Sequence, residues 1–245
     1  MSVEYEREHA GEGQMVMPFY LICDVSLSMS DDMAALNDGI QRLRRSIVAE
    51  PLVDDVAHIG IMTFSDTAKM VVPLTQLSEQ PVPLLRAEGA TDYGAAFREL
   101  ARVIPADFAA LRAQGYRVFR PCAFFLTDGE PLDDDWWETF KATLTYNRIS
   151  GTGMRNHPVF IPFGFGEAPV DVLQCLAYPP ERGKWYHIKS DDIGQVIKLI
   201  LDVIMKTVVA SGQSSSTGQP ALVHTEAPTM ANATVTQGVA SDWLE

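Results

Sequence analysis

The sequence predicts an α/β fold: a Rossmann-like, doubly wound, mostly parallel central sheet with helices on both faces and one short antiparallel edge strand. Short apolar runs alternate along the chain with amphipathic segments, which is typical of parallel strands joined by helices. The runs are apolar at nearly every position, as expected for strands covered on both faces. The crossovers between such strands are expected to be right-handed.

The predicted strands are the apolar runs, and the first of them, residues 15–24 (MVMPFYLICD), ends in an aspartate. Residues 69–74 follow a turn-like Ser-Asp-Thr and are expected to fold back as the antiparallel edge strand. The predicted strands are residues 15–24, 56–64, 69–74, 118–127, 158–165 and 185–188.

The predicted helices carry apolar residues at three- and four-residue spacing. Pro51 is expected to stop the first helix, and Pro105 to kink or break the second. Asp133, Asp134 and Asp135 are expected to start and cap the third. The predicted helices are residues 32–50, 93–113, 134–150, 170–177 and 192–210.

A single domain over residues 15–210 accounts for all of these elements. Residues 1–14 are polar and charged and are expected to form a flexible leader. Residues 211–245 are rich in Ser, Thr, Gly, Gln and Ala, so we expect a low-complexity, disordered tail. Its last residues, SDWLE, are either a short docking motif or an ordinary terminus.

The composition excludes several functions. A net charge of −13 and a pI near 4.7 argue against binding to nucleic acid or to anionic lipid. There is neither an apolar run of the roughly 20 residues that a membrane helix needs nor a signal peptide, so we expect a cytoplasmic protein. The three cysteines form no CxxC motif and the histidines no zinc-ligand spacing, so buried thiols are expected and no zinc site.

Three short motifs place oxygen-bearing side chains where strands end or helices begin. They are Asp24-Val25-Ser26-Leu27-Ser28, Gly89-Ala90-Thr91-Asp92-Tyr93-Gly94 and Thr127-Asp128-Gly129. Because the carboxyl ends of parallel strands meet at one edge of a sheet, these loops are expected to converge. Alternate residues of the first motif can point the same way.

Such a set of side chains suits a hard divalent cation, which takes about six oxygen ligands. Two carboxylates offset its charge, and three hydroxyls add neutral ligands while one position stays open to an incoming carboxylate. We expect Mg²⁺, with Mn²⁺ or Ca²⁺ as possible substitutes. The predicted metal ligands are Asp24, Ser26, Ser28, Thr91 and Asp128.

This constellation resembles the metal-ion-dependent adhesion site (MIDAS) of von Willebrand factor A (vWA) domains, and the resemblance covers about residues 18–210. It implies that the serines and the threonine bind the metal directly and that the aspartates often act through water. Leu27 and Ala90 stand where the family often has Gly.

A closer resemblance is to bacterial stand-alone vWA proteins associated with tellurite resistance. It rests on the short leader, GATDYGAAF and LTDGEPLDDDW. It implies a role in stress signalling, with a kinase and a phosphatase as possible neighbours.

The predicted function is a metal-dependent protein-interaction module, not an enzyme, whose protein partner supplies a Glu or Asp to the cation. The alternative is a metal-dependent phosphoryl-transfer or hydrolytic enzyme with Asp24 as nucleophile. Against it, Ser26 stands where a second aspartate would be, and no phosphate-anchoring lysine follows a strand. A third reading is an assembly subunit with a vestigial metal site.

Overall fold

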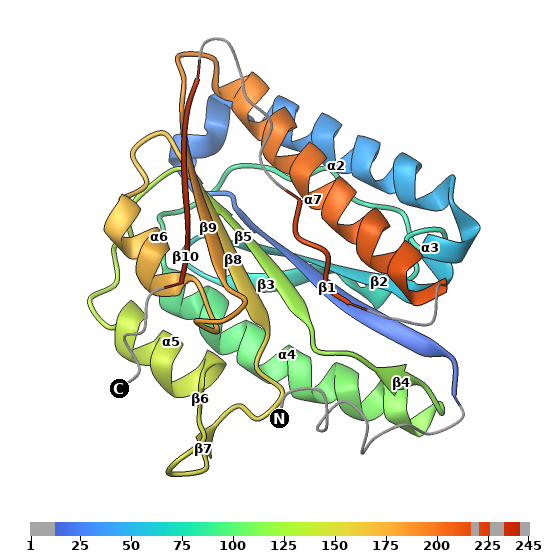
Figure 1. The fold of residues 1–245 in the computed structure, drawn as a ribbon. Helices are drawn as coiled ribbons and strands as arrows, with labels where there is room; N and C mark the ends of the chain where they lie inside the picture. Colours follow the sequence, from blue (N-terminus) through green and yellow to red (C-terminus); the bar gives the residue numbers. More distant parts are fainter. Residues whose placement is uncertain (1–12, 217–220, 226–232, 241–245) are drawn as a thin grey trace.

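The computed structural model describes residues 13–216, 221–225 and 233–240 (Figure 1). The predicted leader falls almost wholly on residues 1–12, and the SDWLE end on residues 241–245; both lie outside the described residues.

A mixed, mostly parallel sheet runs through the middle of the domain, which confirms the predicted fold class. Strands β2, β1, β5, β8 and β9 are parallel, while β3 and β10 run antiparallel at the two edges. The strand order is β10-β9-β8-β5-β1-β2-β3, with the short β4 also beside β1. The strands are β1 (Met15–Asp24), β2 (Ala57–Phe64), β3 (Ala68–Thr75), β4 (Arg117–Val118), β5 (Cys122–Thr127), β8 (Val159–Phe165), β9 (Lys184–Lys189) and β10 (Thr234–Val239).

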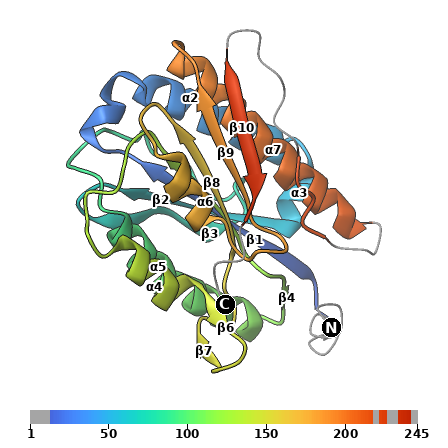
Figure 2. The ribbon, with the colours of Figure 1, turned by 60° about the vertical axis from the view of Figure 1, so that its left-hand side comes forward.

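Helices cover both faces of this sheet (Figures 1 and 2). Alternate residues of β1 divide between two cores: Phe19 and Leu21 pack under α2, α3 and α7, whereas Tyr20 and Ile22 pack under α4 and α5. The helices are the 3₁₀ helix η1 (Leu27–Asp31), α2 (Met33–Val48), α3 (Pro51–Val56), α4 (Tyr93–Ala113), α5 (Trp136–Leu144), α6 (Val170–Leu176) and α7 (Ile193–Ser216).

Two predicted elements and the predicted break at Pro105 need correction. The helix predicted over residues 134–150 ends at Leu144, and a small hairpin of β6 (Tyr146–Asn147) and β7 (Thr152–Gly153) follows it. The Asn147 side chain accepts hydrogen bonds from the backbone N–H groups of residues 149 and 150, a turn that competes with helix. The strand predicted over residues 118–127 is split into β4 and β5, and Pro105 does not break α4.

The prediction of a disordered tail from residue 211 is wrong for part of that segment. Helix α7 continues to Ser216, and β10 pairs with β9 along its whole length. Gly238 lies against the indole ring of Trp185, where a Cβ would be 2.6 Å from Nε1. The β-branched residues of β10 and this close approach favour a strand in a segment whose composition predicts disorder.

Gly39 lies where α2 packs on α7, and a Cβ there would clash with the Leu201 side chain. We expect Gly39→Val to lower the free energy of unfolding by about 1–3 kcal/mol, measured by urea denaturation, because the tight contact has no room for more volume. Gly194→Ala is the control: a Cβ there meets nothing nearer than 3.5 Å, so better helix propensity is expected to leave it neutral or stabilised. Equal losses in both variants would contradict this account of the α2–α7 contact.

Candidate metal centre

The loops that follow β1 and β5 lie side by side because these two strands are parallel neighbours. Cys23 of β1 pairs with Leu126 of β5, so Asp24 and Thr127 come next to each other at the carboxyl edge of the sheet. The structure thus brings the first and third predicted motifs together.

Three side-chain oxygens form a continuous chain at this edge. The hydroxyls of Ser26 and Ser28 are 3.0 Å apart, and the Ser28 hydroxyl donates to Oδ1 of Asp128 over 2.9 Å. Adjacent ligands of an octahedral Mg²⁺, with Mg–O distances of about 2.1 Å, are separated by about 3.0 Å. The two distances between successive oxygens therefore match the distance between neighbouring ligands of a bound Mg²⁺.

Asp24 lies behind these hydroxyls and is almost fully buried. Its Oδ1 accepts a hydrogen bond from the backbone N–H of Ser26 over 2.8 Å, and its Oδ2 accepts one from the Thr127 hydroxyl over 2.8 Å. Asp24 thereby holds the Ser26 loop to the end of β5. Both of its oxygens already have donors, so it suits a supporting position better than an exposed one.

Thr91 reaches the site from the loop before α4. It is buried, and its hydroxyl is the nearest side-chain atom to Gly129, 3.9 Å from where a Cβ would stand. Its carbonyl accepts a hydrogen bond from the backbone N–H of Leu132 over 2.9 Å. The second motif is thus held against the loop that carries Asp128, as the sequence predicts.

Gly89 ties the second motif to the first. Its carbonyl accepts a hydrogen bond from the backbone N–H of Leu27 over 3.1 Å, and the N–H of Glu88 donates to the carbonyl of Val25 over 2.7 Å. Gly89 has a φ of +67°, and a Cβ there would clash with the carboxylate of Asp66. Glycine is therefore required at this point of the loop.

Two supporting residues of the site escape sequence reasoning. The buried Tyr93 hydroxyl donates toward the Gly129 carbonyl at 2.8 Å and the Thr127 hydroxyl at 3.0 Å, which extends the hydrogen-bond chain that ends on Asp24. The carboxylate of Asp133 accepts from the backbone N–H of Tyr93 over 2.8 Å and from that of Gly94 over 2.9 Å. Asp133 therefore caps α4, and its predicted role at the helix that follows it is wrong.

Neither role has a local signal. The acceptor on Asp133 and the N–H groups it binds are about forty residues apart, and only the fold brings them together. Tyr93 stands inside the second motif, but its ring could equally be an ordinary core residue.

The carboxyl groups of the site repel one another and are partly withdrawn from water. Burial raises the pKa of Asp24 to about 6, although its hydrogen bonds act in the opposite direction. Burial also raises the pKa of Asp128, and burial together with the charge of Asp128 raises that of Asp32. A cation bound here would lower the pKa of all three carboxyl groups, because it stabilises their charged forms.

This electrostatic arrangement predicts that cation affinity depends on pH. Protonated Asp24 must lose its proton before a cation can bind beside it, with Asp128 and Asp32 adding to the same effect. Below about pH 6 the affinity for Mn²⁺ is expected to fall up to roughly tenfold per pH unit for each proton displaced. Calorimetric titrations at pH 5.0 and 7.5 measure this, and equal affinities at the two values would contradict it.

The donor set is made only of oxygens. Within the described ranges, no group of three or more His, Cys, Asp or Glu could hold a metal, so a cation here would depend on the hydroxyls. Oxygen ligands suit Mg²⁺, Mn²⁺ or Ca²⁺ rather than softer metals. The residues present fit the cation that the sequence predicts.

The fold that carries this site is the Rossmann-like α/β fold of vWA proteins. The model of the von Willebrand factor type A domain family matches residues 19–130, a segment that includes all three loops of the site. No match is found among curated protein sequences. No helix in the described part of the chain has the length and hydropathy needed to cross a bilayer.

Solved structures with the same fold come from diverse proteins. A von Willebrand factor type A protein from Catenulispora acidiphila has a TM-score of 0.55 at 15% identity, covering 80% of this chain and 43% of its own. The pilus adhesin SpaC from Lactobacillus rhamnosus GG has a TM-score of 0.57 at 14% identity, covering 81% of this chain and 31% of its own. The ArnB paralog VWA2 from Sulfolobus acidocaldarius has a TM-score of 0.50 at 15% identity, covering 78% and 46%. The chain thus spans less than half the length of each.

Proposed function

We propose that the chain is a non-catalytic binding module that binds a protein partner through a divalent cation, with Mg²⁺ as the favoured ion. The observation that carries the proposal is the chain of oxygens from Ser26 through Ser28 to Asp128, spaced 3.0 and 2.9 Å apart. The cation would be held by Ser26, Ser28, Thr91 and Asp128, with Asp24 behind them. When bound, it would supply an electrophilic position for a Glu or Asp of the partner.

An apolar rim supports an interaction role. Leu27, between the two serines, is 63% exposed. Leu132, whose backbone N–H donates to the Thr91 carbonyl, is 65% exposed. Large apolar side chains in exposed positions beside a polar centre are typical of a contact surface. The partner that fits has apolar side chains next to its metal-binding carboxylate.

The charge of the surroundings makes the cation necessary. Burial raises the pKa of Asp32, and the charges of Asp128, Asp31 and Asp192 raise it further, so four carboxyl groups lie near one another at this end of the strands. An incoming Glu or Asp would be repelled by them unless a cation lay between. The interaction is therefore expected to be lost on chelation.

A capture experiment tests this function. The full chain, immobilised, is incubated with lysate of its source organism in Mg²⁺ or in EDTA, beside Asp128→Asn and Leu27→Gln variants. We expect the same proteins to be retained in Mg²⁺ and lost in EDTA and with Asp128→Asn, with Leu27→Gln weakened. Proteins that stay bound equally in EDTA would contradict the proposal.

The position of Asp24 favours binding over catalysis. The enzymatic alternative needs this carboxylate as an exposed nucleophile, but it is 1% exposed and both its oxygens accept hydrogen bonds. The stress-signalling role, the kinase or phosphatase neighbours and the cytoplasmic location stay predictions.

A further inference from the structure

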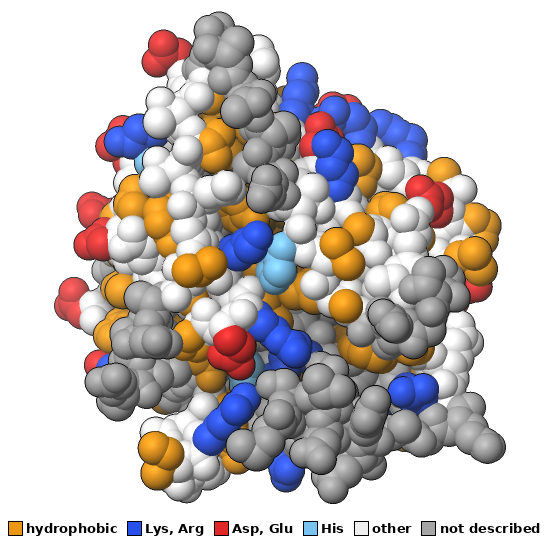
Figure 3. All heavy atoms as spheres, in the orientation of Figure 1, with side chains coloured by type: hydrophobic (Ala, Val, Ile, Leu, Met, Phe, Trp, Pro, Cys, Tyr) orange, Lys and Arg blue, Asp and Glu red, His pale blue; other side chains and the backbone are white. Residues whose placement is uncertain are grey.

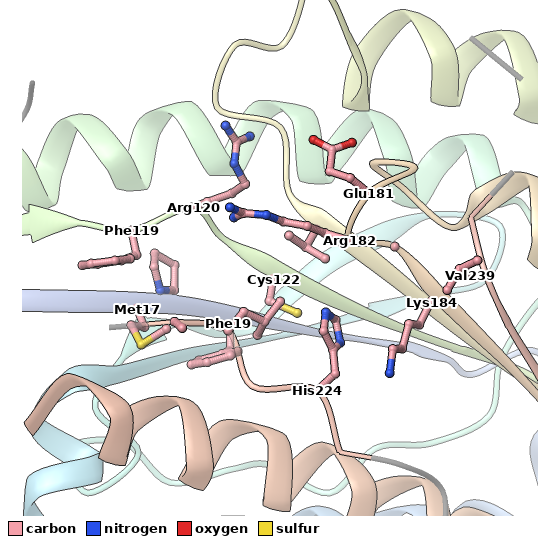
Figure 4. A pocket seen from close by; sticks show the side chains of 15 residues that line it. Met17, Phe19, Phe119, Arg120, Cys122, Glu181, Arg182, Lys184, His224 and Val239 are labelled. Atoms are coloured by element: carbon pink, nitrogen blue, oxygen red, sulfur yellow. The ribbon is translucent and has the colours of Figure 1, made fainter. Parts of the chain in front are cut away.

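A cavity lies at the opposite end of the parallel strands from the candidate metal centre. It has a volume of about 300 Å³ and is lined mainly by residues at or just before the beginnings of four parallel strands, with His224 and Val239 of the C-terminal part closing it (Figure 4). Met17 and Phe19 of β1 lie in its wall, whereas Asp24 ends the same strand. At about 3.3 Å per residue, roughly 20 Å separates the two sites.

Basic side chains gather around this cavity. Arg120, Arg182 and Lys184 line it, although the chain as a whole has a net charge of −13. Figure 3 shows Lys, Arg and His side chains gathered at a hollow near the middle of this face. Among the described lining residues Glu181 is the only acid, and its carboxylate lies 3.7 Å from the guanidinium of Arg148. We call this cavity the basic pocket.

The rest of the wall is apolar. Figure 4 shows Met17, Phe19, Phe119 and Cys122 on the side of the pocket formed by β1 and β5, with the arginines above them. A cavity of this size with an apolar wall and a few converging polar groups is typical of a small-molecule site.

Arg120 shows that a basic group of the pocket is fixed in position, and His224 shows that the electrostatic potential in the pocket is positive. Nη1 of Arg120 donates to the carbonyl of His157 over 2.9 Å, which fixes that guanidinium in place. Burial, together with the charges of Lys184 and Arg182, lowers the pKa of His224 to about 4. His224 is therefore a neutral imidazole in a positive environment near pH 7.

We propose that the basic pocket binds a small amphipathic anion, one in which a phosphate or carboxylate is joined to an apolar body. The guanidinium and ammonium groups would bind the anionic group, and the wall of β1 and β5 would cover the apolar body. A purely anionic ligand would leave the apolar wall uncovered, and a purely apolar ligand would leave the basic groups without a partner from the ligand. The pocket shares no residue with the candidate metal centre, so its ligand is expected to bind without a cation.

Calorimetric titration of the full chain in EDTA tests the proposal with phenyl phosphate and benzoate as probes, and with inorganic phosphate and phenol as controls. At least one probe is expected to bind at least tenfold more tightly than its controls. Arg182→Gln and Lys184→Gln are expected to weaken binding at least fivefold. Lys189→Gln, which removes the same charge from the exposed end of β9, is expected to leave it unchanged. Asp128→Asn, which affects only the metal site, should bind the probes like the wild type.

Three results would overturn the proposal. The first is that neither probe binds to the full chain. The second is that Lys184→Gln, shown by circular dichroism to be folded, binds the probes as tightly as Lys189→Gln does. The third is binding that appears only in a chain shortened to end at Ala240. That result would assign the pocket to the acidic residues of SDWLE, because Val239 lines the cavity and this sequence follows it.

Discussion

Asp128→Asn is expected to lower the affinity for Mg²⁺ and Mn²⁺ by about a hundredfold, because it removes one of two carboxylates from a site otherwise made of hydroxyls. The folded state is expected to change little. Asp128 is only half-buried, and an amide oxygen can accept the same hydrogen bond from the Ser28 hydroxyl. Calorimetric titration gives the affinity, and urea denaturation in EDTA gives the stability.

Asp134→Asn is the matched control for Asp128→Asn. It makes the same chemical change six residues further along, in an exposed side chain. We expect its cation affinity to equal that of the wild type. If both variants lost affinity alike, net charge rather than coordination would explain the effect, and Asp128 would not be a ligand.

Asp24→Asn is expected to abolish the stabilisation by cation and to raise the free energy of unfolding without cation at pH 7.5. The pKa of Asp24 in the folded protein, about 6, lies above its ordinary value of 3.8. The folded state is thus favoured by the protonated carboxyl, and this contribution is lost as pH rises through about 6. The uncharged variant does not undergo this loss. Without cation at pH 7.5, it is expected to be more stable than the wild type by about 1–2 kcal/mol, an advantage that disappears near pH 4.

The hydrogen bonds around Asp24 allow this substitution. An asparagine oxygen can still accept from the backbone N–H of Ser26, and the Thr127 hydroxyl has a second acceptor in the Gly129 carbonyl, 3.3 Å away. With Mg²⁺ present, the wild type is expected to gain stability and the variant to gain none. Urea denaturation at pH 4 and 7.5, with and without Mg²⁺, measures both effects. A variant that responds to Mg²⁺ like the wild type would show that Asp24 plays no part in the site.

The fold could be predicted because its strands are long apolar runs in which each residue is buried on one face or the other. The edge strand β3 could also be predicted, since it follows a clear turn. The β6–β7 hairpin and β10 could not. The Asn147 side chain sets the turn of the hairpin, and β10 is held by its pairing with β9 and by the close approach of Gly238 to Trp185; the composition of these segments signals neither.

The candidate site could be predicted to the extent that its residues lie in short motifs at strand ends. The order of the strands then brings Asp24, Ser26, Ser28 and Asp128 together. Asp133 could not be assigned to α4, because the sequence places it beside another helix. The basic pocket had no signal at all, since its lining comes from scattered single residues that become neighbours only in the folded chain.

A crystal structure of the chain grown in MnCl₂, with anomalous differences measured for manganese, tests the central claim most directly. We predict one strong peak about 2.1–2.3 Å from the hydroxyls of Ser26 and Ser28, with Thr91 and Asp128 reaching the ion directly or through one water. An empty position at that edge of the sheet in saturating manganese, or manganese bound only among surface carboxylates elsewhere, would contradict the account.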